Sequence, residues 1–188
     1  MKKLLTILLL ASMSFTFTSC DSWLDVNKNA DVHDYIQEDL YLAGILSAVG
    51  QGNYWDIRAT SVLTQSFGTS GYTTYASHFY SKASDNAAEM WRVTYWHAGM
   101  NLENMINQSI EAESWTLAGI GYAIKAFCWD MLTKLHGEVP MKQAFEPGRL
   151  SHDYDYQDEV YTQVREWANT AIEYLEMEDN TDYGSRLR

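Results

Sequence analysis

One segment of the chain gathers the residue types that bind sugars. Between Gly68 and Asp85, aromatic residues alternate with serines and threonines, and His78 and Asn86 lie within or beside the segment. Aromatic rings can stack on the apolar C–H faces of a sugar, and short polar side chains can bind its hydroxyl groups. The same rings could instead fold inward and cover neighbouring helices, and this alternative stays open. The segment predicts ligand binding through its aromatic side chains, Tyr72, Tyr75, Phe79 and Tyr80.

The amino end indicates a second kind of chemistry. Lys2 and Lys3 precede an apolar run from Leu4 to Phe17, and small residues lead to Cys20. This order is typical of a bacterial lipoprotein signal, which is removed immediately before a cysteine that then carries lipid. The run of about 14 residues is interrupted by hydroxyl side chains and is shorter than the roughly 20 apolar residues that span a bilayer. The sequence therefore predicts an exported protein with lipid on Cys20.

The familiar motifs of enzymes and metal sites are missing from the sequence. It has no Gly-x-Ser-x-Gly motif and no His-Glu-x-x-His pair, and its histidines have no spacing typical of a shared metal. The acids from Asp153 to Glu159 lack the central glycine and the spaced final glutamate of a calcium loop, and helix capping together with helix-dipole complementarity explains them. Two carboxylates across a cleft, as in a glycosidase, are neither shown nor excluded by a sequence. We expect no enzymatic activity, no metal and no cofactor.

The composition argues against one broad class of partner. The chain has 25 acidic and 13 basic side chains, and its formal net charge is −12. Removal of residues 1–19 takes away Lys2 and Lys3 but no acid, which brings the charge to −14. Nucleic acid needs a basic surface, so it is not expected as a partner. An acidic body fits a protein that its lipid holds away from anionic headgroups.

Helical periodicity dominates the rest of the chain. Apolar residues at Ile36, Leu40, Ala43, Leu46 and Val49 predict a helix over about 32–49 that ends at Gly50 and Gly52, with a shorter helix over 55–67. A third helix begins near a cap formed by Asn86 and Glu89. It places on one face Trp91, Tyr95, Ala98, Leu102, Met105 and Ile106.

Two further helices follow. Ser114 caps the first of them, and Gly137 with Pro140 ends it. In this helix Gly119 and Gly121 allow close approach of a neighbouring backbone, which explains them better than a nucleotide-binding loop. The last helix begins near Asp155. Long helices with short connections pack antiparallel, so the sequence predicts an all-α stack of helical hairpins of the tetratricopeptide-like kind, with one irregular aromatic-rich loop.

Several reactive or aromatic side chains are assigned to the core. Cys128 lies in an apolar helical stretch and is expected to be a small buried hydrophobe and not a nucleophile. Trp23 and Trp55 flank irregular segments and stay open. Core packing is expected for the aromatic residues that have apolar partners at helical spacing, Trp91, Tyr95, Trp96, Trp129 and Trp167.

Four short motifs follow one another in the chain. They are Cys20-Asp-Ser-Trp-Leu-Asp-Val-Asn27, Trp91-x-x-x-Tyr95 with Asn101-Leu-x-Asn104-Met-Ile106, Leu135-His-Gly137-Glu-Val-Pro140, and Asp158-Glu-Val-Tyr161. In this order they resemble the mature start, the first long helix, the turn closing the next helix and the start of the following helix in SusD/RagB-type lipoproteins of Bacteroidetes. The resemblance covers nearly the whole chain.

This resemblance implies a helical lipoprotein on the outer leaflet of the outer membrane, facing the cell surface. Such a protein captures a nutrient, usually a glycan, and delivers it to a SusC-like TonB-dependent outer-membrane transporter. The expected organisation is a signal peptide over 1–19, a lipidated tether over 20–31, and the N-terminal part of a SusD-like helical domain over 32–188. Two alternatives stay open: a helical scaffold that docks the transporter without binding ligand, and a carbohydrate-cleaving enzyme.

Overall fold

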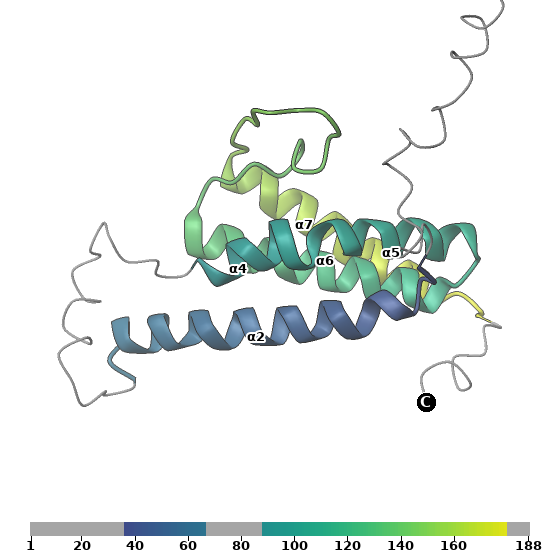
Figure 1. Cartoon of the computed structure of the whole chain (residues 1–188), viewed down its shortest axis with the longest axis horizontal. Helices are drawn as coiled ribbons and strands as arrows, with labels where there is room; N and C mark the ends of the chain where they lie inside the picture. Colours follow the sequence, from purple (N-terminus) through teal and green to yellow (C-terminus); the bar gives the residue numbers. More distant parts are fainter. Residues whose placement is uncertain (1–35, 67–87, 180–188) are drawn as a thin grey trace, which may run out of the picture. The chain divides into compact units, whose positions relative to one another are not determined.

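The computed structural model describes residues 36–66 and 88–179 (Figure 1). All of them belong to one compact unit that begins at Ile36. The described part is helical, with an isolated β-bridge between Val139 and Asp155 as its only β pairing. This confirms the predicted all-α class. The elements in chain order are α2 (Leu40–Leu63), α4 (Glu89–Arg92), the π-helical segment η2 (Val93–His97), α5 (Gly99–Glu111), α6 (Trp115–His136) and α7 (Gln157–Leu175).

Helix α2 is one helix where the sequence predicted two. Gly50 and Gly52 lie inside it and do not end it. A Cβ at Gly52 would lie 2.5 Å from Val93 Cγ2 and 3.3 Å from Met90 Sδ, so this glycine serves close packing. The predicted apolar face was wrong at Leu40 and Leu46, which are exposed, and right at Val49, which packs against the core. The other side chains of α2 that pack into the core were not in the predicted face: Tyr41, Leu42, Ile45 and Ala48.

The predicted third helix is interrupted by the π-helical segment. Its register shifts where the Ala98 N–H donates to the Val93 carbonyl, at 2.9 Å, and closes a turn one residue wider than that of an α-helix. A Cβ at Gly99 would clash with the Thr94 carbonyl oxygen and the Phe145 ring, which makes glycine necessary there. The predicted core positions on this stretch from Ala98 to Ile106 are buried.

The start of this stretch is capped from another helix. Asp56 of α2 accepts the backbone N–H groups of Glu89, at 3.3 Å, and of Met90, at 2.8 Å. The predicted cap residue Asn86 lies outside the described residues. A carboxylate on α2 therefore satisfies the first donors of α4, which links the two elements.

Helix α6 packs against both α5 and α7 and runs antiparallel to each of them (Figure 1). Gly121 of α6 lies against Ile106 of α5, and Gly119 lies against Leu175 of α7, each with less than 3 Å between an added Cβ and the neighbour. This confirms that the small residues of α6 allow close packing. Gly137 ends α6 with a positive φ of 80°, as predicted. Ser114 precedes α6, but its side chain makes no capping hydrogen bond, and the Thr116 N–H donates instead to Asp179 at 2.7 Å.

A loop from Gly137 to Tyr156 joins α6 to α7. The Asp155 carboxylate accepts the N–H groups of Met141 and Lys142, both at 2.8 Å. The Tyr95 hydroxyl donates to the Pro140 carbonyl at 2.9 Å, and burial raises the pKa of this tyrosine. The Asp155 bonds join the two ends of the loop, and the Tyr95 bond holds the start of the loop against the helical segment η2. Among the described residues, no helix is long and apolar enough to cross a membrane.

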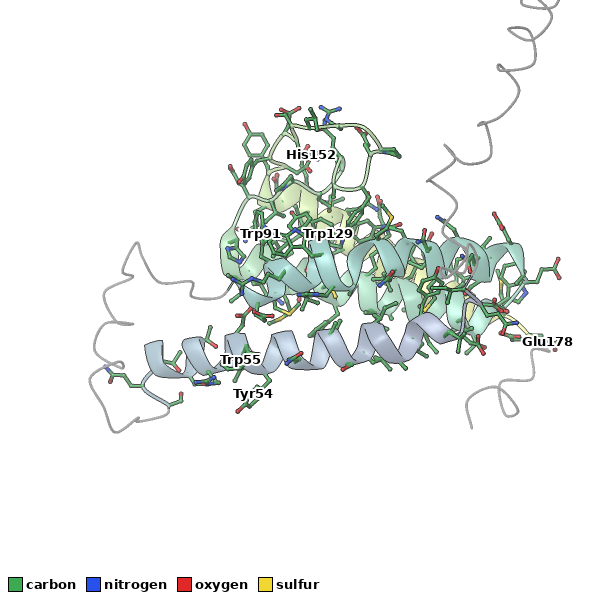
Figure 2. The ribbon with its side chains drawn as sticks, in the orientation of Figure 1. Tyr54, Trp55, Trp91, Trp129, His152 and Glu178 are labelled. Atoms are coloured by element: carbon green, nitrogen blue, oxygen red, sulfur yellow. The ribbon has the colours of Figure 1, made fainter. Side chains whose placement is uncertain are left out.

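The aromatic predictions are mostly confirmed. Trp129 is 3% exposed, and Trp91, Tyr95 and Trp167 pack against the same core cluster. Trp96 is 70% exposed, so its prediction as a core residue was wrong. Figure 2 shows Trp91 and Trp129 close to each other in the body of the helices, with Tyr54 and Trp55 on α2. The open case Trp55 is half exposed, whereas Trp23 lies outside the described residues.

Candidate functional site

The residues predicted to act lie outside the described part of the chain. This holds for the lipidation residue Cys20 and for the aromatic residues Tyr72, Tyr75, Phe79 and Tyr80. Their roles therefore stay predictions. The candidate site described here is formed by other residues.

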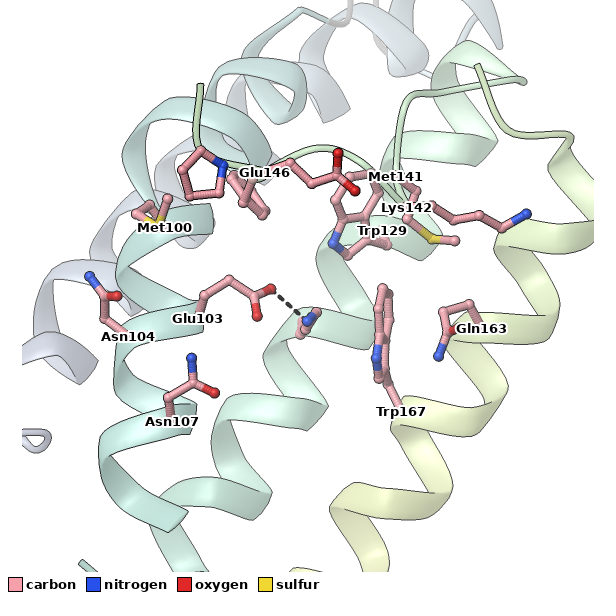
Figure 3. A pocket seen from close by; sticks show the side chains of 13 residues that line it. Met100, Glu103, Asn104, Asn107, Trp129, Met141, Lys142, Glu146, Gln163 and Trp167 are labelled. Atoms are coloured by element: carbon pink, nitrogen blue, oxygen red, sulfur yellow. Dashed lines mark ion pairs between the residues drawn. The ribbon is translucent and has the colours of Figure 1, made fainter. Parts of the chain in front are cut away.

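A groove of about 640 Å³ lies between α5, α6, α7 and the loop that follows α6 (Figure 3). Its volume falls within the range of roughly 300–1,000 Å³ that is usual for small-molecule sites. The lining combines aromatic, amide and charged side chains, contributed by Met100, Glu103, Asn104, Asn107, Lys125, Trp129, Met141, Lys142, Phe145, Glu146, Pro147, Gln163 and Trp167.

Helix α5 supplies one wall. Met100, Glu103, Asn104 and Asn107 follow one another at spacings of three, one and three residues, which places them on one side of the helix. The opposite side of α5 carries Leu102, Met105 and Ile106, which are buried in the core. The amphipathic pattern that anchors α5 thus also fixes which polar side chains border the groove.

Aromatic side chains form the base of the groove and its opposite wall. Trp129 of α6 contacts Tyr95 edge to face, with 5.5 Å between the ring centroids, and Trp167 of α7 at 6.3 Å. Because Trp129 is 3% exposed, it serves as the floor and offers little surface to a ligand. Trp167 and Phe145 are half buried, so they present the apolar surface of the site.

One ion pair crosses the groove. The Lys125 ammonium of α6 lies 2.5 Å from Glu103 Oε1 of α5 and 4.5 Å from the centre of the Trp167 ring (Figure 3). Both side chains are largely shielded, with 13% exposure for Lys125 and 24% for Glu103. The pair therefore ties α5, α6 and α7 together within the site.

The loop side of the groove is held by Asp155 and Lys142. Burial alone would raise the pKa of Asp155, but the N–H groups of Lys142 and Met141 and the Lys142 ammonium lower it below its ordinary value. The Lys142 ammonium lies 3.1 Å from Glu159 and 3.4 Å from Asp155. The hydrogen bond to Glu159, and after it the one to Asp155, raises the pKa of Lys142. Asp155 thus acts as a backbone anchor.

The other side chains singled out in the sequence have structural surroundings. Cys128 is 2% exposed, and burial raises the pKa of its thiol to about 12, which confirms it as a buried hydrophobe. Among the described residues, no group of three or more acidic, histidine or cysteine side chains could hold a metal ion. Residues Asp158 and Glu159 lie in the first turn of α7, where acids complement the helix dipole.

Sequence reasoning missed this groove. Asn104 stands in one of the motifs that resemble a known family, and Trp167 was assigned to the core, but nothing in the sequence joined them. A signal was present in the polar side of α5, where uncharged amides adjoin the core stripe. That this side faces Trp167 depends on the packing of α5 and α7 on α6.

Comparison with known proteins identifies a family. A SusD-like family model, described as starch-binding and associating with the outer membrane, matches residues 42–186. No curated protein and no solved structure matches significantly.

Proposed function

Because this chain belongs to the SusD-like family, described as starch-binding and associating with the outer membrane, we propose that it binds a glycan in the groove between α5 and α7. The protein acts as a binding protein without catalysis. One observation carries this proposal: apolar ring surface and uncharged amides border the same groove. The rings are Phe145 and Trp167, and the amides are Asn104, Asn107 and Gln163.

The chemistry of the groove suits a sugar. The C–H face of a pyranose ring can pack on the exposed part of Trp167, and each amide can both donate to and accept from a hydroxyl group. Lys125 covers part of the Trp167 ring, so the ligand contacts the surface that this ammonium leaves free. The aromatic segment that contains Tyr72, Tyr75, Phe79 and Tyr80 is a further proposed contact.

Calorimetry with starch-derived oligosaccharides tests this function. Replacing Asn104 and Asn107 together by alanine is expected to weaken binding by about tenfold or more, because two hydrogen-bonding groups are lost. Trp167→Ala is expected to do the same. Trp55→Ala is the matched control, since Trp55 is also an indole with a cation over its ring, at 4.3 Å, but is half exposed and lies on α2 outside the groove. Equal binding by all these variants would contradict the proposed site.

The proposed role includes delivery to a transporter in the outer membrane. Residues 1–19 would be a signal peptide, Cys20 would carry the lipid, residues 20–31 would form the tether, and residues 32–188 would belong to the helical domain. The protein would then face the cell surface and hand its glycan to a SusC-like TonB-dependent transporter. Mass spectrometry of the membrane-derived protein should find acyl groups on Cys20, and an unmodified thiol would refute the anchor.

A scaffold that only docks the transporter is the second candidate. One observation favours it: α2 carries an exposed apolar face, and its only charged residues are Asp56, which is buried, and Arg58, which is exposed. The face consists of large side chains that helical geometry places together, Leu40, Leu46, Tyr54 and Ile57. Co-purification with a SusC-like barrel, lost in Leu46→Glu, together with no oligosaccharide binding, would favour this candidate over glycan capture.

A carbohydrate-cleaving enzyme is the third candidate, and the groove gives it little support. The two groove carboxylates are engaged with cations: Glu103 with Lys125 at 2.5 Å and Glu146 with Arg149 at 3.0 Å. Chromatography after long incubation should return the oligosaccharides unchanged. Shortened products that disappear in Glu103→Gln would establish cleavage instead.

A further inference from the structure

The cations of the groove are both neutralised by carboxylates. Lys125 is paired with Glu103, and Lys142 is paired with Asp155 and Glu159. The two ammonium groups are therefore not offered to a ligand as unpaired charges. This arrangement matters because a groove with an unpaired cation would attract acidic sugars.

We propose that Glu103 determines the ligand class of the groove: by neutralising Lys125 it makes the site select uncharged sugars and disfavour acidic ones such as uronates. This inference rests on the proposed glycan binding at the same site. Glu103 would then have two roles: its ion pair with Lys125 links α5 to α6, and the same pair sets the preference of the groove for uncharged ligands.

The surroundings of Lys125 explain why Glu103 has this effect. The ammonium is held between one carboxylate and the Trp167 ring, at 2.5 Å from Glu103 Oε1 and 4.5 Å from the ring centre. With 13% exposure of Lys125 and 24% of Glu103, solvent screens these charges less than it screens surface pairs. A ligand carboxylate that approaches Lys125 would therefore meet the negative charge of Glu103 at nearly the same place. Its desolvation would be poorly compensated.

Lys142 does not replace Lys125 in this role. Its side chain is 54% exposed and is held by two carboxylates, at 3.4 Å from Asp155 and 3.1 Å from Glu159. Removing one of these acids would leave the other in place. Replacement of Glu103 is thus the single change that leaves a shielded groove cation without its carboxylate.

The test compares one neutral sugar with its acidic counterpart. Maltohexaose and maltohexaose oxidised at C6 to the uronate share the same rings and linkages and differ in charge. Wild-type protein is expected to bind the neutral form roughly tenfold more tightly, and Glu103→Gln should reduce that ratio by about tenfold. Glu111→Gln is the matched control, because it removes the same charge from the exposed end of α5, eight residues or about 12 Å further along the helix.

A second variant is expected to move the ratio in the opposite direction. Lys125→Met leaves Glu103 without its cation, so it should increase the preference for neutral maltohexaose over the uronate. Thermal unfolding confirms that each variant is folded. An unchanged ratio in both Glu103→Gln and Lys125→Met, while neutral binding persists, would overturn the role of Glu103 alone. Absence of binding of either sugar by wild-type protein and by Glu103→Gln would overturn both this role and the proposed function.

Discussion

Replacing Asp155 by asparagine should destabilise the fold more than any other change to a loop acid. Asp155 is 8% exposed, and its carboxylate accepts two backbone N–H groups at 2.8 Å, those of Met141 and Lys142. Hydrogen bonds to a charged acceptor contribute about 1.5–3 kcal/mol each. Both N–H groups donate to Oδ2, so an asparagine amide oxygen can still accept them, but only as a neutral and weaker acceptor. The asparagine NH₂ group then takes the place of Oδ1 and faces the Lys142 ammonium, which is also a donor. We expect a loss of about 2–4 kcal/mol in the free energy of unfolding.

The pH dependence gives this prediction its sharpest form. The pKa of Asp155 is lowered in the folded protein, so the carboxylate stabilises the fold above its ordinary pKa of 3.8. This contribution is lost as the pH falls below that value through the lowered pKa. Urea unfolding should therefore show a constant difference between wild type and Asp155→Asn from pH 5 to 7. The difference should shrink when the pH is lowered below 3.8.

A neighbouring acid provides the control. The Asp153 side chain is 85% exposed and accepts one long hydrogen bond, 3.4 Å from Gln143, so Asp153→Asn should change stability by less than about 0.5 kcal/mol. Because Met141 and Lys142 line the groove, Asp155→Asn should also weaken oligosaccharide binding. Equal unfolding midpoints for Asp155→Asn and Asp153→Asn at pH 7 would refute the assigned role of Asp155.

Three further predictions concern the packed interior. Gly99→Ala should lower the free energy of unfolding by about 1–3 kcal/mol and reduce oligosaccharide affinity, because its Cβ clashes with the Thr94 carbonyl and with Phe145 of the groove. Gly50→Ala is the control: the space around Gly50 is open, so this change should be neutral or stabilising in urea unfolding. In a Cys20→Ser protein, Cys128 should react with a thiol reagent at pH 8 only as fast as the fold opens, since burial raises its pKa to about 12; rapid labelling of the native protein would contradict its burial. Thr94→Val should raise the free energy of unfolding by about 1 kcal/mol, because the buried Thr94 hydroxyl has no hydrogen-bond partner among the described residues. Thr133→Val should lower it, because the 2.7 Å bond to the Gly137 carbonyl is lost. A loss of stability in both variants would show that Thr94 has a partner.

The helices around α6 could be predicted from the sequence because local signals and packing agree there. The apolar stripe of α6, its end at Gly137 and the small residues at Gly119 and Gly121 all indicate the same antiparallel neighbours. Those predictions are confirmed by the contacts of Gly119 with Leu175 and of Gly121 with Ile106.

The α2 prediction failed because glycine has two uses. Gly52 favours a helix end by its backbone freedom, but here it lies in mid-helix because the Val93 side chain needs its space. The π-helical segment has no recognisable pattern either, since its hydrogen bond from Ala98 to Val93 differs from an α-helical one by a single residue. That shift accompanies the exposure of Trp96, which periodicity assigned to the core.

The groove could be predicted only in part. The polar side of α5 can be derived from residue spacing, but the position of Trp167 opposite Glu103 arises when α7 packs on α6 across Gly119. The aromatic segment that the sequence favoured, with Tyr72 and Tyr80, lies outside the described residues and stays a prediction.

A structure of the protein with bound maltohexaose tests the central claim most directly. Glycan capture by the groove predicts a sugar ring against Trp167, within hydrogen-bond distance of Asn104 or Asn107, with the Glu103–Lys125 pair intact beside it. A sugar held elsewhere, with the groove between α5 and α7 empty, would contradict the claim.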